Sequence, residues 1–222
     1  MRNDRGYTLI EAMVTIAILG VLMALAVGGW GSLSSKGAVQ NAAQDFHSTL
    51  LNARQRATER GSDVWVIIYP YIDRTGNDAP NTNPGAYFVV EDVDLDFKTY
   101  YKDTFAPPSS IRPASPNALL EQVWLDTYPR HNARFLKTPI ASGSAYQAPF
   151  NAMGGSGCSF CTGTTKKGAI VFNGEGIARF LNHDASEDYS RSASVTFSSF
   201  DIPLENHFLA ITGPTGFVGI YP

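Results

Sequence analysis

Two cysteines, spaced for metal or redox chemistry, are the first candidate site in this sequence. Cys158 and Cys161 form a Cys-x-x-Cys inside the glycine-rich run GGSGCSFCTG. A structural zinc site needs four ligands, commonly two such pairs, and the sequence holds no second pair. A redox dithiol usually lies at the start of a helix, whereas these flanks are typical of a loop. We therefore expect a local disulfide, with free thiols and transient metal binding as the alternatives.

Three acidic residues alternate in the run EDVDLDF and could begin a calcium loop. They are Asp92, Asp94 and Asp96. A calcium loop of this kind requires glycine at its sixth position and glutamate at its twelfth, where this chain has Phe97 and Asp103. In a strand the three carboxylates would instead share one solvated face. We expect no metal site, with calcium binding as the weaker alternative.

The remaining candidate groups show no catalytic pattern. The four histidines, His47, His131, His183 and His207, lack ligand spacing, and no nucleophile or phosphate-loop motif is present. The run 173–176 (NGEG) is a turn rather than a phosphate cradle, because no helix follows it. We therefore expect neither an enzyme nor a cofactor.

Glu11 stands at the edge of a long uncharged run, Ala12 to Trp30. As a helix these 19 residues span roughly 28 Å, close to the bilayer hydrocarbon thickness of about 30 Å. A buried core helix and a secretory signal are the alternatives, but a signal has an apolar core of only about 7–15 residues. The run therefore predicts a membrane span, and a carboxylate beside it needs a partner because a charge there is costly.

The residues before this run set its expected orientation. Met1 to Gly6 reads MRNDRG, with Arg2 and Arg5 against Asp4. Positive flanks remain cytoplasmic. We expect a single pass through the inner membrane, with the rest of the chain in the periplasm.

The run from Gly6 to Glu11 (GYTLIE), directly before the apolar segment, resembles the class III signal of type IV pilins and type II secretion pseudopilins. The resemblance implies that a prepilin peptidase removes the leader, residues 1–6, after Gly6. Tyr7, an aromatic in place of the usual Phe, would then be the new N-terminus and would be N-methylated. Glu11 would be the fifth mature residue, pairing with the Tyr7 ammonium group of a neighbouring subunit. The alternative is that Glu11 only reaches toward the cytoplasmic headgroups.

The apolar spacing predicts one helix from Tyr7 to about Arg60. Its first part, residues 7–36, would be the membrane and filament-core segment. Beyond it, apolar residues recur every three or four positions, which is typical of a helix packed on a sheet; they are Val39, Ala42, Ala43, Phe46, Leu50, Ala53 and Ala57. Gly61 is a natural C-terminal stop.

Beyond Gly61 the apolar pattern becomes strand-like. Expected strands, rich in β-branched and aromatic residues, are Asp63–Tyr69, Ala86–Glu91, Ala169–Phe172, Ile177–Leu181, Ala193–Ser198, His207–Thr212 and Phe217–Tyr221. The fold class is therefore α+β, a long helix packed on a mostly antiparallel sheet. Residues 37–222 would form the periplasmic helix and head, with an insertion at about 92–165.

The run from Leu51 to Gly61 (LNARQRATERG) resembles minor pilins and pseudopilins of the GspH/FimT/FimU type. This resemblance implies a minor pilin in or at the tip of a type IV pilus, helping to prime its assembly. The alternatives are a minor pseudopilin of a type II secretion system, and a DNA receptor or adhesin displayed by the pilus with residues 92–165 as its contact surface. The implied partners are other major and minor pilins or pseudopilins, the prepilin peptidase and the inner membrane.

The charge distribution argues against nucleic acid as a partner. The net charge is −3, and loss of the leader, which holds two arginines and one aspartate, makes it −4. The last 22 residues, from Asp201 to Pro222, contain no Lys or Arg. Nucleic-acid binding requires clustered basic residues, so we expect none.

Overall fold

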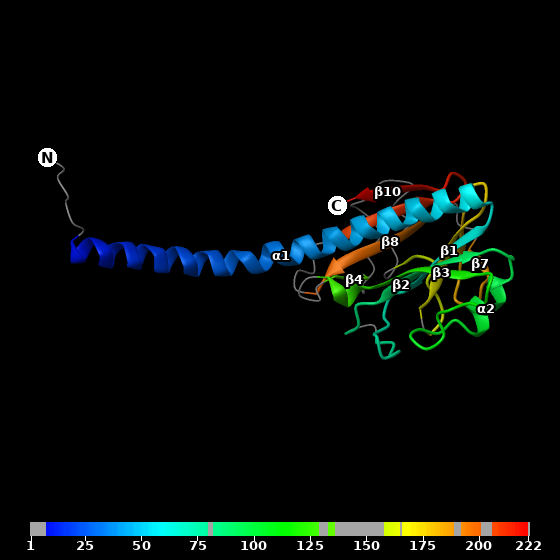
Figure 1. Ribbon diagram of the computed structural model, residues 1–222, viewed down its shortest axis with the longest axis horizontal. Helices are drawn as coiled ribbons and strands as arrows, with labels where there is room; N and C mark the ends of the chain where they lie inside the picture. Colours follow the sequence, from blue (N-terminus) through cyan, green and yellow to red (C-terminus); the bar gives the residue numbers. More distant parts are fainter. Residues whose placement is uncertain are drawn as a thin grey trace.

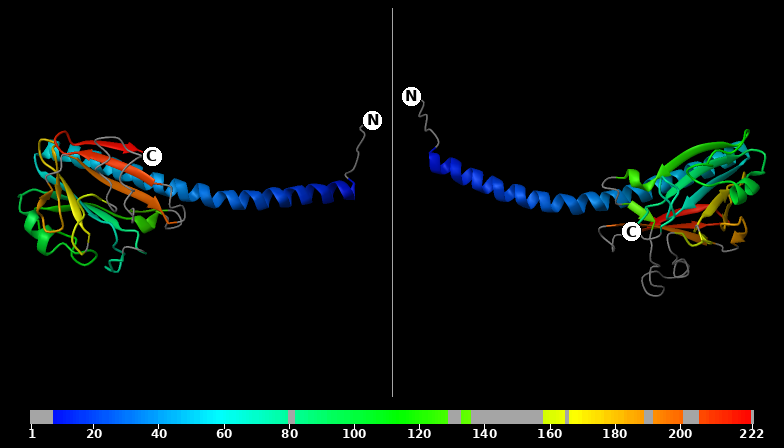
Figure 2. Two further views of the ribbon diagram at one scale, coloured as in Figure 1. Left: turned by 180° about the vertical axis from the view of Figure 1, so that it is seen from behind. Right: turned by 90° about the horizontal axis from the view of Figure 1, so that it is seen from below.

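The protein consists of a rod-like helix and a head built from two sheets (Figure 1). The computed structural model describes residues 8–79, 82–128, 133–135, 158–164, 166–188, 192–200 and 206–221, without the side chains of 26–35 and 221. Figure 2 shows from two further sides that the first half of the helix extends clear of the head. Only the second half of this helix can therefore contribute to the core.

The rod is α1 (Leu9–Arg60), a single helix of 52 residues. At its start the Thr8 hydroxyl accepts a hydrogen bond from the Glu11 backbone N–H at 3.4 Å, as an N-cap does. At its end Gly61 adopts a left-handed conformation with φ of 68° and donates its N–H to the Ala57 carbonyl. Glycine adopts this conformation without a Cβ penalty. The predicted helix and its glycine stop are thus confirmed.

The head contains two antiparallel sheets rather than the one sheet expected from sequence. The larger has the order β3 (Ala118–Trp124), β2 (Ala86–Asp92), β1 (Asp63–Tyr69), β5 (Gly168–Phe172), β6 (Ala178–Leu181) and β7 (Glu187–Asp188). The smaller has the order β10 (Phe217–Tyr221), β9 (Asn206–Thr212), β8 (Ser192–Ser199) and β4 (Ala133–Phe135). The α+β class is confirmed.

The second half of α1 and both sheets enclose the main core. The predicted apolar stripe of α1 is buried there, together with Val64, Val66 and Ile68 of β1 and residues of β8 and β9. The alternate residues of β1, Trp65, Ile67 and Tyr69, enter a second core on the opposite face of the larger sheet. Successive strand residues point to opposite faces. Two covered faces therefore explain why this strand is apolar at nearly every position.

The second core is covered by elements that the sequence did not predict. A short helix, α2 (Phe97–Asp103), buries Phe97 and Tyr101 against β1. Strand β3 adds to the edge of β2 with a register shift between Val89 and Val90, and a 3-10 turn, η1 (Leu125–Thr127), follows it. β3 carries no clean alternation because most of its residues are half-buried.

Candidate functional site

Glu11 is the one predicted docking residue that the structure describes. It lies in the first turn of α1 and is exposed. A carboxylate is favourable there because the helix N-terminus carries partial positive charge. Within the described part of the chain, no basic side chain pairs with it. Gly6 and Tyr7 lie outside the described residues, so their cleavage and docking roles remain predictions.

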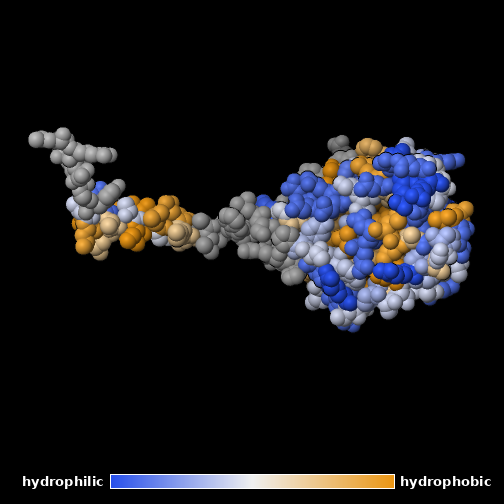
Figure 3. Space-filling model, in the orientation of Figure 1, coloured by the Kyte–Doolittle hydropathy of each residue, from blue (hydrophilic) through white to orange (hydrophobic). Residues whose placement is uncertain are grey.

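The first turns of α1 expose apolar side chains on all sides. Eleven large apolar residues between Leu9 and Leu25 are each at least 52 % exposed. Figure 3 shows this apolar surface along the projecting rod. Contiguous exposed apolar area of this kind marks a surface that another molecule or a membrane covers.

The predicted membrane span, Ala12 to Trp30, extends into residues 26–35, whose side chains lie outside the described set. Across the described residues alone, no helix is both long and apolar enough to count as a candidate membrane span.

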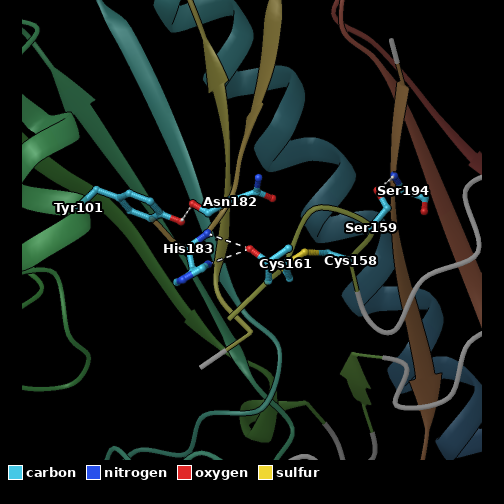
Figure 4. Close-up of a disulfide and its surroundings, with 8 residues drawn as sticks. Tyr101, Cys158, Ser159, Cys161, Asn182, His183 and Ser194 are labelled. Atoms are coloured by element: carbon cyan, nitrogen blue, oxygen red, sulfur yellow. Dashed lines mark hydrogen bonds between the residues drawn. A yellow bond between two sulfur atoms is a disulfide. The ribbon is translucent and has the colours of Figure 1, made fainter. Parts of the chain in front are cut away.

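Cys158 and Cys161 form a disulfide, with their Cα atoms 5.3 Å apart (Figure 4). Both cysteines are buried. Toward the smaller sheet, the Ser159 N–H donates to the Ser194 carbonyl of β8 at 2.9 Å, and the Ser194 N–H donates to the Ser159 hydroxyl at 3.0 Å.

The other side of the disulfide ring contacts the larger sheet. Phe160 is fully buried and its ring lies 5.5 Å from that of Phe180 on β6. Thr162 bonds through its hydroxyl to His183, which follows β6. The disulfide ring thus joins the two sheets, and both of its cysteines are buried.

The carboxylates of Asp92, Asp94 and Asp96 lie within 4.8 Å of one another. They do not share a strand face, as the sequence suggested, because β2 ends at Asp92 and a bend follows. Asp92 is only 2 % exposed and accepts hydrogen bonds from the Trp65 indole and the Phe97 N–H. Burial raises the pKa of Asp92 to about 6, against these hydrogen bonds.

Two carboxylates of this cluster already accept hydrogen bonds from a side chain of the protein. The Asn117 amide donates to Asp94 at 2.7 Å and to Asp96 at 3.0 Å, and its oxygen accepts from the Val93 N–H. Asn117 therefore ties the bend to the start of β3. Among the described residues this is the only group of three or more His, Cys, Asp or Glu placed to hold a metal ion.

Two of the described histidines form hydrogen bonds to groups elsewhere in the fold. His47 on α1 lies 3.3 Å from the Val218 carbonyl of β10, and His183 bonds Thr162. His207 lies in β9. His131 lies outside the described residues.

Comparison with known proteins gives one match, at the N-terminus. Residues 1–27 match the family described as the prokaryotic N-terminal methylation motif. No curated protein and no solved structure matched the chain. The motif indicates a type IV pilin-like or pseudopilin protein.

Proposed function

We propose that this pilin-like chain is a minor pilin, incorporated in or at the tip of a type IV pilus and helping to prime its assembly. One combined observation carries the proposal: the methylation motif covers residues 1–27, and the helix that begins there exposes apolar side chains on every side. Such a helix needs a bilayer before assembly and other helices after it. The head then stays in the periplasm and becomes the displayed part of the subunit.

In this proposal Gly6 is the cleavage site and Tyr7 the methylated N-terminus. Mass spectrometry of the chain from cell envelopes should find a chain that begins at methylated Tyr7. Gly6→Leu should leave the leader uncleaved, because the peptidase subsite must admit the residue before the cut. Gly20→Ala is the matched control, since a Cβ at Gly20 meets nothing within 4 Å. A mature-size Gly6→Leu chain contradicts the cleavage assignment.

The phenotype of a deletion strain distinguishes the minor pilin role from the two alternative roles. Deletion should abolish piliation and twitching while protein secretion continues. Loss of type II secretion with intact pili would instead identify a minor pseudopilin. Normal piliation and secretion, with loss of surface attachment or DNA uptake, would identify a displayed receptor.

A further inference from the structure

A pocket of about 300 Å³ lies on the side of the head that α2 covers. It is formed where β1 ends, where α2 passes into residues 104–107 and where β5 is about to begin. Its buried lining includes Tyr69, Ile72, Phe105 and Lys167. α1 and the main core lie on the other face of the larger sheet (Figure 1), so in the proposed assembly a neighbour packed along α1 would leave this pocket open.

Lys167 is the unusual member of this lining because it is a buried cation. It is 7 % exposed, and its ammonium group donates to the Tyr101 carbonyl at 2.6 Å. The same nitrogen lies 4.4 Å from the centroid of the Tyr101 ring. Among the described residues no carboxylate oxygen forms an ion pair with it, although Asp103 is close enough to favour its charge.

Burial lowers the pKa of Lys167 to about 8, against the opposing effect of Asp103. A buried ammonium group without a counter-ion is costly, and proteins normally pair such a charge. Asp103 offsets part of this cost without forming an ion pair among the described residues, and a carboxylate in direct contact with Lys167 would offset more.

A purely structural role explains part of this arrangement. The Tyr101 carbonyl belongs to the last turn of α2 and needs a donor. One N–H of Lys167 fills that need. A neutral donor would do the same at lower cost, and two N–H groups of the ammonium remain for another acceptor.

We propose that this pocket binds the carboxylate of a small monoanion with an apolar body. The carboxylate pairs with Lys167, and the apolar part lies against Tyr69, Ile72 and Phe105. The charged lining, with Lys167 and Lys102 against Asp78 and Asp103, is neutral overall. The pocket would therefore repel a ligand with several negative groups, and attraction for one carboxylate comes from direct contact with Lys167. A free aromatic acid and the C-terminal residue of a peptide both present this chemistry.

The test uses the purified full chain in detergent micelles, with binding followed by calorimetry and ligand-observed NMR. The probes are benzoate against benzamide, and the peptide Gly-Gly-Phe with a free against an amidated C-terminus. Carboxylates should bind at least about tenfold more tightly than their amides, since a charged hydrogen bond is lost. Binding of benzoate alone identifies a free acid as the ligand class, and binding of the peptide alone identifies a chain terminus.

Three variants locate the site. Lys167→Met should remove the preference for the carboxylate. Ala106→Trp should block binding, because exposed Ala106 lines this pocket and a large side chain fills it without entering the core. Thr99→Trp is the matched control, since exposed Thr99 lines the neighbouring pocket beside Asp94 and Asp96 and does not line this one.

Equal affinity for carboxylate and amide overturns the proposal, as does absence of binding by all four probes. Binding that survives Ala106→Trp or is lost in Thr99→Trp also overturns it. If Lys167→Met does not fold, the Ala106→Trp result decides.

Discussion

Arg56 on α1 forms an ion pair with the buried carboxylate of Glu91 on β2. Its Nε and Nη2 donate to the same oxygen of Glu91 at 3.0 and 2.7 Å, and Ser62 donates to the other oxygen at 3.2 Å. Burial opposes ionisation of Glu91, but Arg56, Ser62 and Arg60 together outweigh it and hold its pKa below the usual value. The end of the long helix is therefore fixed to the larger sheet by charge as well as by apolar packing.

Arg56→Met should destabilise the head by about 2 kcal/mol, less than for a fully buried pair because the Arg56 side chain is 38 % exposed. The loss leaves Glu91 buried without its main partner. Urea unfolding followed by circular dichroism measures the change. Arg74→Met is the control: Arg74 donates through Nε and Nη2 to the two oxygens of Asp126, but this ion pair is more exposed, and its loss should cost under about 1 kcal/mol. Equal losses of stability in Arg56→Met and Arg74→Met would contradict a larger contribution from the more buried ion pair.

Gly216→Ala should destabilise the head by about 2 kcal/mol or more. Gly216 has φ of 58°, and a Cβ there would overlap the Gly176 carbonyl oxygen in the turn between β5 and β6. The neighbouring hydrogen bond from the Ala178 N–H to the Gly213 carbonyl joins the two sheets. The control is Gly37→Ala, where the helical glycine has open space and alanine should stabilise by about 0.5–1 kcal/mol. Thermal unfolding should show a lower Tm for Gly216→Ala and a higher Tm for Gly37→Ala than for the wild type.

Replacing both cysteines by serine should cost about 2 kcal/mol, the loop-closure value for a ring closed over three residues. The loss should also loosen the connection between the sheets that the disulfide ring provides. Hydrogen exchange should therefore accelerate at Ser159 and Ser194, which bond across that connection. An equal acceleration of exchange throughout the head, with no larger effect at Ser159 and Ser194, would show that the disulfide does not act locally.

The pH dependence of stability should carry a contribution from Asp92. Its folded pKa of about 6 exceeds its ordinary value of 3.8. Between those values the folded state binds more protons than the unfolded state, so this group adds stability as pH falls through about 6. Urea unfolding of wild type and Asp92→Asn should show a difference that shifts in favour of wild type at lower pH. A difference that does not change with pH would refute the assignment.

Glu11→Ala should be cleaved normally yet enter filaments poorly. Loss of one half of a shielded pair should reduce incorporation by about tenfold or more. Immunoblots of sheared filaments against total chain measure this ratio. Glu59→Ala is the control, because Glu59 is an exposed carboxylate at the other end of α1 that bonds only Gln55 among the described side chains. Normal incorporation of Glu11→Ala would remove the docking role.

The long helix and its buried stripe could be predicted because their signals are local. The spacing from Val39 to Ala57 follows the helical period, and Gly61 terminates the helix through its own backbone conformation. The β9–β10 hairpin was predicted for the same reason, since a short turn joins two apolar runs. The division into two sheets was not, because both faces of β1 are apolar and the sequence does not say what covers each face.

The sequence by itself determined the N-terminal methylation motif and the long helix that begins within it. These features depend on residues close together in the chain. Only the tertiary structure decided which distant groups meet: Arg56 with Glu91, Ser159 with β8, and Lys167 with the Tyr101 carbonyl. Such partners depend on strand register and on how α2 packs against the sheet, and a periodic pattern contains neither.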